Sequence, residues 1–132
     1  MEPSGEGRAA WPATWHQARS RVADVLVVNR FRVEEGDATS FAEDLANALA
    51  LLAAKPGYVA GAVGRNLDDP ALWVLETRWA NVGSYRRALS AYDVKLGAVP
   101  LLSRALDEPS AYEVIGNDGA AGLNEARPRE LG

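Results

Sequence analysis

Two aromatic side chains, Trp79 and Tyr85, are the first candidates for contact with a bound molecule. Trp79 ends a run of alternating side chains, residues 72–79, and Tyr85 follows six residues later in a helical pattern. Together we expect these two side chains to form one wall of a core or pocket. Asn29 is the third candidate, because an amide on the inward face of a central strand needs hydrogen-bond partners. None of the three side chains is reactive alone, so they indicate where a site lies without indicating which reaction takes place there.

The sequence lacks the residue types on which most catalytic sites depend. It contains no cysteine, which excludes disulfides and thiolate chemistry, and its one histidine is His16, near the N-terminus. We find no phosphate-binding loop, nucleophilic triad or zinc-ligand spacing. Asp68 and Asp69 precede Pro70 and are typical of a turn, so we expect no metal site there. The simplest alternative is that the candidate Trp and Tyr are core residues, which is the commoner role of such a pair.

The elements that must position these side chains follow from periodicity and turn residues. Strands are predicted at residues 24–33, 58–65, 72–79 and 110–115, and helices at residues 38–54 and 82–92, the second continuing less regularly to residue 106 past Pro100. Ser40 with Glu43 has the spacing of a capping box at the first helix, and Asn81 or Ser84 can cap the second. The order of strand, helix, strand, strand, helix, strand is the split βαβ pattern of a ferredoxin-like α+β fold. It predicts a four-stranded antiparallel sheet with its helices on one face.

The sheet face that the helices leave uncovered carries Leu26, Val28 and Val74. The charged residues of that face are Arg30, Arg32, Glu76 and Arg78. We expect these four to form cross-strand or interface ion pairs. An apolar, charge-matched sheet face left bare is a liability, so we expect two copies to pack face to face as a homodimer.

Composition limits the chain to one modest domain. Its 132 residues are 48% hydrophobic, which is enough apolar material for a single core. The formal net charge of -4 argues against a dedicated nucleic-acid binder. The sequence has no signal-peptide pattern and no run of the about 18 to 20 apolar residues that a membrane helix needs, so we expect no membrane contact and a cytoplasmic location.

The two ends of the chain differ from its middle. Residues 1–24 mix prolines, glycines and scattered charge, which favours a flexible arm, or one that drapes on the domain or a partner subunit through Trp11 and Trp15. Residues 116–132 are rich in glycine and charge and are predicted to be a flexible tail. Residues 25–115 then form the folded domain.

Four features of the middle of the chain point to a known family. They are the strand VVNRFRV, the helix ending in Pro56-Gly57-Tyr58, the strand ending in Trp79, and Ser84-Tyr85 on the helix that follows. On these features, residues 25–115 resemble the antibiotic biosynthesis monooxygenase superfamily, which implies a small dimeric α+β barrel. The resemblance does not imply one activity, because the family includes cofactor-free oxygenases of anthrones and hydroquinones, heme-degrading enzymes and quinol oxygenases.

The heme-degrading branch of that family matches the chain at Asn29, which falls on the position of a pocket asparagine. The branch departs elsewhere, because Ala88 stands where a helical tryptophan is expected and the iron-ligating histidine falls near Ala98. With no histidine in the core, an imidazole-ligated heme is the least favoured reading.

The cofactor-free polyketide oxygenases use a tryptophan at the end of the third strand and a tyrosine six residues later, which Trp79 and Tyr85 match. Their asparagine four residues before the tryptophan is Leu75 here, and their helical arginine falls near Val99. Asn29 is a candidate to replace the missing amide. Arg86, Arg87 and Lys95 are candidates for the missing positive charge.

The resemblance therefore implies a cofactor-free monooxygenase that oxidises an aromatic polyketide, anthrone or quinol with O2. Such a substrate must become a carbanion or phenolate in a dry pocket and pass an electron to oxygen. The expected catalytic residues are Asn29 and Tyr85, as partners of the substrate oxygen, and Trp79, as an aromatic wall. The expected substrate-binding residues are Phe31, Phe41, Leu75 and Tyr92. The alternative is a non-catalytic small-molecule binder or accessory protein on the same scaffold. The absence of the expected asparagine, at Leu75, and of the expected arginine, near Val99, favours this alternative.

Overall fold

The computed structural model describes residues 23–117 and 122–123. Residues 23–114 form one compact unit, whose fold follows. The expected N-terminal arm, with Trp11, Trp15 and His16, lies outside the described residues. In the second unit, two short strands, β6 (Gly116–Asn117) and β7 (Gly122–Leu123), form an antiparallel pair within the expected tail.

Four antiparallel strands form the sheet of the first unit, in the order β3-β4-β2-β5. They are β2 (Val25–Arg32), β3 (Tyr58–Arg65), β4 (Leu72–Trp79) and β5 (Ala111–Glu113). Strand β2 pairs along its whole length with β4, and β3 forms a hairpin with β4. The two strands that come first and third along the chain are therefore central. This is the ferredoxin-like order that the sequence predicts.

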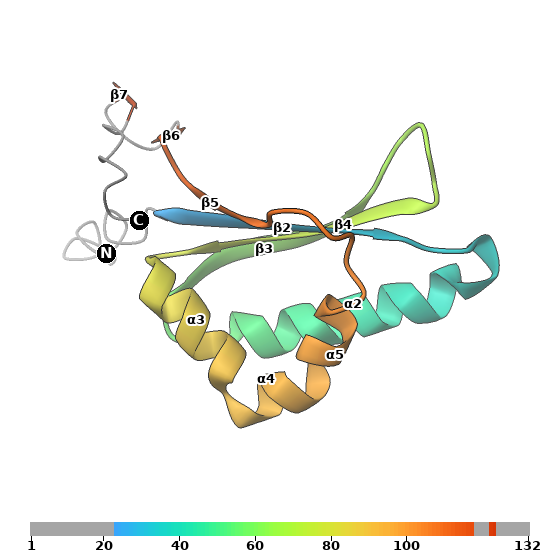
Figure 1. Ribbon diagram of the computed structural model, residues 1–132, viewed down its shortest axis with the longest axis horizontal. Coiled ribbons are helices and arrows are strands. Elements are labelled where there is room, and N and C mark those ends of the chain that lie inside the picture. The colour runs from blue at the N-terminus through green and yellow to red at the C-terminus, as the bar shows by residue number, and fades with distance from the viewer. Residues whose placement is uncertain (1–22, 118–121, 124–132) are drawn as a thin grey trace, which may run out of the picture. The chain divides into compact units, whose positions relative to one another are not determined.

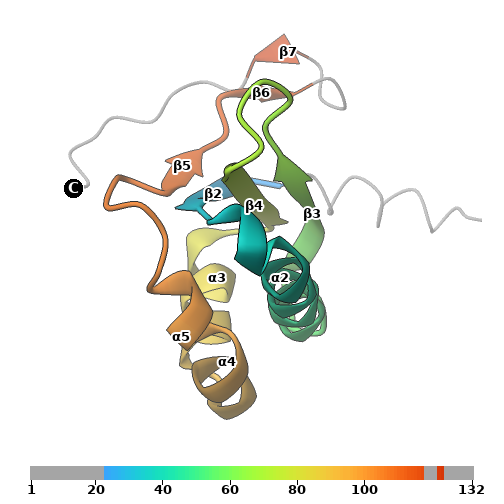
Figure 2. The same cartoon turned by 90° about the vertical axis from the view of Figure 1, so that its right-hand side faces the viewer.

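All helices of the first unit lie on one face of this sheet, as Figures 1 and 2 show. They are the 3-10 turn η2 (Glu35–Asp37) and the α-helices α2 (Ala38–Ala53), α3 (Val82–Ser90), α4 (Tyr92–Gly97) and α5 (Val99–Leu102). Seen along the strands in Figure 2, α2 lies under one side of the sheet and the other three α-helices lie under the opposite side. We call the covered face the inner face and the uncovered one the outer face.

The layer between sheet and helices is filled with apolar side chains that alternation and helical periodicity place there. Strand β4 buries Trp73, Leu75 and Trp79, strand β2 buries Val25, Val27 and Phe31, and helix α2 buries Phe41, Leu45, Ala48 and Leu52. The later helices add Ala88, Val94, Ala98 and Leu101. Full burial of one large apolar side chain stabilises a fold by about 1.5–3 kcal/mol, so this layer holds the helices on the sheet.

The second helical region is divided into three short helices. Ala91 is extended, with φ -67° and ψ 142°, and separates α3 from α4. Pro100 lies in the first turn of α5, where a proline needs no helical hydrogen bond, so it restarts the helix as expected.

The expected capping box of the first helix does not form. Asp37 is the N-cap residue of α2 and its side chain makes no capping hydrogen bond, while the Ser40 hydroxyl donates to the Asp37 carbonyl at 3.2 Å. The prediction was wrong because the η2 turn leads directly into α2. The helix therefore begins before Ser40, which lies within its first turn.

The charged residues of the outer face do not form the expected cross-strand pairs. Arg30 bonds Glu108 at 2.7 and 2.8 Å, Arg32 bonds Asp69 at 2.9 Å, and Arg78 bonds Glu76 of its own strand at 2.6 Å. The cause is the register between β2 and β4, which places an aliphatic residue opposite each of the four charged residues on these strands. Their partners are therefore found along the same strand or in neighbouring loops.

Candidate functional site

Strand β4 presents Leu75, Thr77 and Trp79 to the inner face, and all three are buried. Trp79 is 0% exposed, and its Nε1 donates a hydrogen bond of 2.9 Å to the Thr77 hydroxyl two residues earlier on the same face. The polar atom of this indole is therefore already satisfied within the protein. A bound molecule in this region would meet Trp79 through its ring.

Trp79 lies between two tyrosines, and we call Tyr58, Trp79 and Tyr85 the aromatic cluster. The ring centroids of Trp79 and Tyr85 are 5.7 Å apart with an interplanar angle of 51°. Those of Trp79 and Tyr58 are 5.5 Å apart with an angle of 87°, an edge-to-face contact. Both separations lie in the range that aromatic pairs favour. The contact between Trp79 and Tyr85 was expected from their spacing.

The start of α3 fixes the position of Tyr85. The Asn81 side chain accepts a hydrogen bond of 2.8 Å from the Ser84 amide, so Asn81 caps the helix as one of the two expected candidates. Gly57, at φ 89°, packs against Ser84, and a Cβ at that glycine would overlap the serine hydroxyl. Only glycine allows the approach and the left-handed conformation together. Tyr85, the next residue, is thereby held against the sheet.

Burial changes the acidity of both tyrosines in the aromatic cluster. It raises the pKa of Tyr85 above the ordinary value for a phenol. It also raises the pKa of Tyr58, with a smaller contribution from the negative charge of Glu76. Both hydroxyls are therefore protonated near neutral pH and act as hydrogen-bond donors there.

Asn29 lies on the inner face of β2, between the buried side chains of Val27 and Phe31 and opposite Leu75 of β4. Its side chain is half-buried. Within residues 23–117 and 122–123, the side-chain amide of Asn29 forms no hydrogen bond. An amide in such surroundings usually has partners in the protein, so Asn29 is open to an outside partner.

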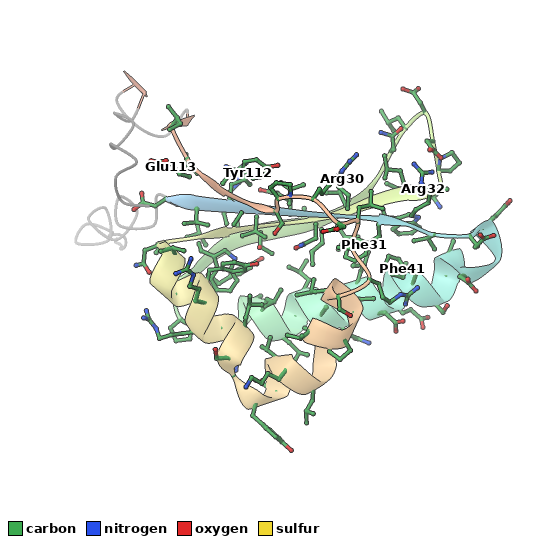
Figure 3. The ribbon with its side chains drawn as sticks, in the orientation of Figure 1. Arg30, Phe31, Arg32, Phe41, Tyr112 and Glu113 are labelled. Carbon is green, nitrogen blue, oxygen red and sulfur yellow. The ribbon has the colours of Figure 1, made fainter. Side chains whose placement is uncertain are left out.

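The expected substrate-binding residues divide into three that are buried and one that is exposed. The ring centroids of Phe31 and Phe41 are 5.2 Å apart, and both side chains lie in the layer between sheet and helices, as Figure 3 shows. Leu75 is 1% exposed in the same core. Tyr92, at the start of α4, is 77% exposed. The structure thus brings together the three buried residues and sets Tyr92 apart from them.

Sequence reasoning missed two members of this region, Tyr58 and Thr77. Tyr58 reaches the aromatic cluster because β3 is bulged between Tyr58 and Ala60 and because Gly61 has no side chain. A Cβ on Gly61 would lie 2.6 Å from the Tyr58 hydroxyl. The glycine in a short strand was the available signal, since it predicts a bulge or a close approach. Thr77 was placed on the correct face, but its bond to Trp79 was not foreseen.

Three open grooves lie on residues 23–114, and none of these three is lined by Asn29 or the aromatic cluster. Within the described ranges, no group of three or more His, Cys, Asp or Glu side chains is placed to hold a metal ion. The helices of that same part of the chain are too short or too polar for any of them to cross a membrane.

Comparison with known proteins identifies relatives of this fold. SnoaB, a cofactor-independent oxygenase from Streptomyces nogalater, is 25% identical in two crystal structures, with TM-scores of 0.64 and 0.63. Each match covers 75% of this chain and 100% of SnoaB. A conserved protein from Methanosarcina mazei is 19% identical, with a TM-score of 0.60 over 73% of this chain and 97% of its own. A search of curated protein sequences finds no significant match.

The family model for antibiotic biosynthesis monooxygenases matches residues 24–95. The matched segment runs from the first strand of the sheet through α3 and into α4, and so contains Asn29 and the whole aromatic cluster. Because this match covers more than half of the sequence, the chain belongs to the antibiotic biosynthesis monooxygenase family.

Proposed function

We propose that this protein is a cofactor-independent oxygenase that oxidises an aromatic polyketide, anthrone or quinol with O2. The proposal is carried by Asn29, whose half-buried amide on the inner face bonds to none of the described residues. A polar group in such a place is retained at a cost in stability, and a phenolic or keto oxygen of a substrate would satisfy it. The likeness to SnoaB, a cofactor-independent oxygenase, supports the same class of reaction.

Three side chains divide the work of binding in this proposal. Asn29 donates an amide N–H to the substrate oxygen on which negative charge develops. Tyr85 is the second donor, because its raised pKa keeps the hydroxyl protonated while the substrate anion forms. Trp79 contacts the aromatic rings of the substrate through its own ring, since its Nε1 is engaged with Thr77.

The oxidation itself takes place between the substrate and O2. An anthrone loses a proton from its methylene carbon to water, and the carbanion passes one electron to O2, giving a substrate radical and superoxide. The two combine through a new C–O bond as a peroxide, and loss of water leaves a ketone. One oxygen atom stays in the product and the other leaves in water with both methylene hydrogens. The protein binds the anion, orients it and excludes bulk water.

The remaining candidate residues take supporting parts. Phe31, Phe41 and Leu75 are the apolar neighbourhood of Asn29, because Phe31 is two residues along β2, Leu75 lies opposite Asn29 on β4, and Phe41 packs on Phe31. Because these three side chains are packed against one another, a substrate would contact them only after the short helices on that side of the layer shift outward. Tyr92, exposed on α4, would then stand at the rim of the opening.

Oxygen uptake by the purified, metal-stripped protein tests the proposal. Anthrones and dihydroxynaphthalenes are supplied with a chelator present, and a heme titration is followed in parallel by its absorption band. We expect uptake above the uncatalysed rate without metal, flavin or heme. A folded protein whose oxygen trace equals that of buffer contradicts the oxygenase.

A non-catalytic small-molecule binder or accessory protein is the second candidate, and the packing of the core favours it. Leu75, at the position where the polyketide oxygenases that the chain resembles carry an asparagine, is 1% exposed and fills the core. A binder of this kind would be stabilised by an anthrone or hydroquinone without consuming oxygen. A melting curve recorded with each compound therefore separates the two candidates.

We also propose that two copies associate through the outer face. The face carries half-buried Leu26, Val28 and Val74, and Tyr112, which is 50% exposed and projects from this face in Figure 3. No helix of the first unit covers it (Figure 1). Association of two such faces would remove this apolar surface from water. The cytoplasmic location stays a prediction.

A further inference from the structure

We propose that the groove between α2 and the edge strand β3 is a second ligand site, which binds a small aromatic carboxylate. The groove has a volume of about 530 Å³, within the range of small-molecule sites. Its apolar wall includes Ala38 and Ala42 of α2 and Val63 of β3. Arg65, Trp73 and Glu43 supply its polar groups. The next three features indicate which ligand fits.

The first feature is the indole of Trp73, which lines the groove. Trp73 is 7% exposed, and its Nε1 is buried with no hydrogen-bond partner among the described residues. Phe41 packs edge-on against the ring, with centroids 5.9 Å apart and an interplanar angle of 81°. A buried N–H without an acceptor is rare in folded proteins, and in this proposal an acceptor group of the ligand satisfies it. The ligand therefore carries a hydrogen-bond acceptor.

The second feature is the guanidinium of Arg65, which lies 5.1 Å from the centroid of the Trp73 ring. Arg65 is directly opposite Trp73 in the register of β3 and β4. Its side chain is exposed, and no carboxylate among the described residues pairs with it. An arginine stacked on an indole keeps its N–H groups directed outward in one plane, which suits a carboxylate. The acceptor of the ligand is therefore an anion.

The third feature is the first turn of α2, whose residue Ala38 lines the groove. The helix has 16 residues, so its dipole adds to the attraction for an anion, while the Ala38 amide itself donates to the Glu35 carbonyl. Glu43 acts in the opposite direction, but its carboxylate is exposed and screened by water. A planar apolar body completes the ligand, since it can lie against the alanine and valine side chains of the wall.

This groove adjoins the apolar side of the candidate oxygenase site, because Trp73 is opposite Phe31 in the register of β2 and β4, but it is distant from the aromatic cluster. Trp73 and Trp79 are six residues apart on one strand, a separation of roughly 20 Å at about 3.3 Å per residue. The proposal does not rest on the proposed function, because the ligand contacts that carry it are Trp73 and Arg65 and its test measures binding without oxygen.

The test uses the indole N–H signals of the full-length, ¹⁵N-labelled protein. Trp73→Phe assigns one of the four tryptophan signals, and the parent protein is then titrated with benzoate and, separately, with the neutral amide benzamide. Arg65→Gln removes the charge of an exposed side chain, and Arg86→Gln, at an exposed residue of α3, is the matched control.

We expect benzoate to shift the Trp73 signal until it saturates and benzamide to leave it in place at the same concentrations. Arg65→Gln should weaken benzoate binding at least about tenfold, as loss of a charge-assisted hydrogen bond does, whereas Arg86→Gln should not. Glu43→Gln should strengthen it, because one negative charge is removed. An unmoved Trp73 signal, equal shifts from benzoate and benzamide, or unchanged affinity in Arg65→Gln would overturn the proposal.

Discussion

Trp73 and Trp79 face the same side of β4, yet their indole nitrogens are in opposite situations. The Nε1 of Trp79 donates to Thr77, and that of Trp73 finds no acceptor in the part of the chain that the structure describes. A buried donor left without a partner costs about 1–3 kcal/mol, whereas a satisfied one contributes about 0.5–1.5 kcal/mol to stability. One substitution made at both positions therefore has different consequences for the free energy of unfolding.

We predict that Trp79→Phe lowers the free energy of unfolding by about 2–3 kcal/mol, because packing and the bond to Thr77 are lost together. Trp73→Phe should lower it by less than about 1 kcal/mol, since the lost packing is offset by removal of the unpaired N–H. Urea denaturation of both variants beside the parent protein measures the difference. Equal losses at the two positions would contradict this account of the two indoles.

Asn29 is the residue on which the proposed chemistry depends most directly. We predict that Asn29→Ala reduces the turnover of an anthrone or dihydroxynaphthalene by roughly ten- to a hundredfold, the effect of losing one donor to a developing anion. Its melting temperature should change little, because the amide bonds to none of the described residues. Oxygen uptake measures the first effect and thermal denaturation the second.

Asn47→Ala, on the exposed side of α2, is the matched control for that variant and should retain full turnover. If Asn29→Ala oxidises its substrate as fast as the parent protein, Asn29 has no part in the mechanism.

At the scale of the elements, an ion pair joins the loop after α5 to the central strand β2. Arg30 bonds both carboxylate oxygens of Glu108, and the Leu106 amide donates to the Arg30 carbonyl at 2.7 Å. Arg30 lowers the pKa of Glu108 below its ordinary value. The Glu108 carboxylate therefore binds a proton less readily in the folded protein than in the unfolded chain, so its ionised form stabilises the fold.

A lowered pKa in the folded state gives stability that is present above the unfolded pKa of a glutamate, about 4.3, and is lost as the pH falls through the folded value. The melting temperature is expected to decrease as the pH is lowered from about 6 to about 3. We predict that this decrease is smaller in Glu108→Gln, because the variant lacks the carboxylate that becomes protonated in that range. Glu35→Gln, on the exposed η2 turn, is the control and should keep the fall of the parent protein. Identical pH dependence in the parent protein and Glu108→Gln would exclude the ion pair as a source of acid sensitivity.

The elements themselves were largely predictable because their signals are local. The hairpin strands β3 and β4 begin and end at the predicted residues, and Asn66 bonds the amides of Asp68 and Asp69, as the turn chemistry between them indicates. Helix α2 begins at the predicted residue, but its cap was assigned to Ser40 instead of Asp37, because a 3-10 turn before a helix leaves no clear mark in the sequence. The ion pairs of the outer face depend on strand register, which the alternation of side chains does not determine.

At the scale of the whole molecule, the outer face is the surface on which association depends. We predict that Val28→Asp converts a dimer to a monomer, because it places a charge at the centre of the apolar surface that two copies would bury. Leu96→Asp, at a leucine 63% exposed on α4, is the control and should leave the dimer intact. Sedimentation velocity measures both. A parent protein that sediments as a monomer at all accessible concentrations would overturn the proposed assembly.

The candidate site was only partly predictable, because it is assembled from segments far apart in sequence. Trp79 and Tyr85 could be paired from a six-residue spacing, and α3 fulfils that prediction. Tyr58 could not, since its contact with Trp79 depends on a bulge in β3 and on the space above Gly61. The burial of Phe41 against Phe31 likewise follows from how α2 lies across the sheet, which single-element patterns do not determine.

The aromatic cluster also gives the protein a built-in optical reporter. Trp79 is enclosed in a dry core, so its fluorescence lies at shorter wavelength than that of an indole in water, and Tyr58 and Tyr85 are near enough to pass excitation energy to it. A compound that enters between Asn29 and this cluster must alter that emission before any oxygen is consumed. Occupancy of the candidate site can therefore be followed by fluorescence without a label, with Trp79→Phe as the control that separates this emission from that of the other three tryptophans.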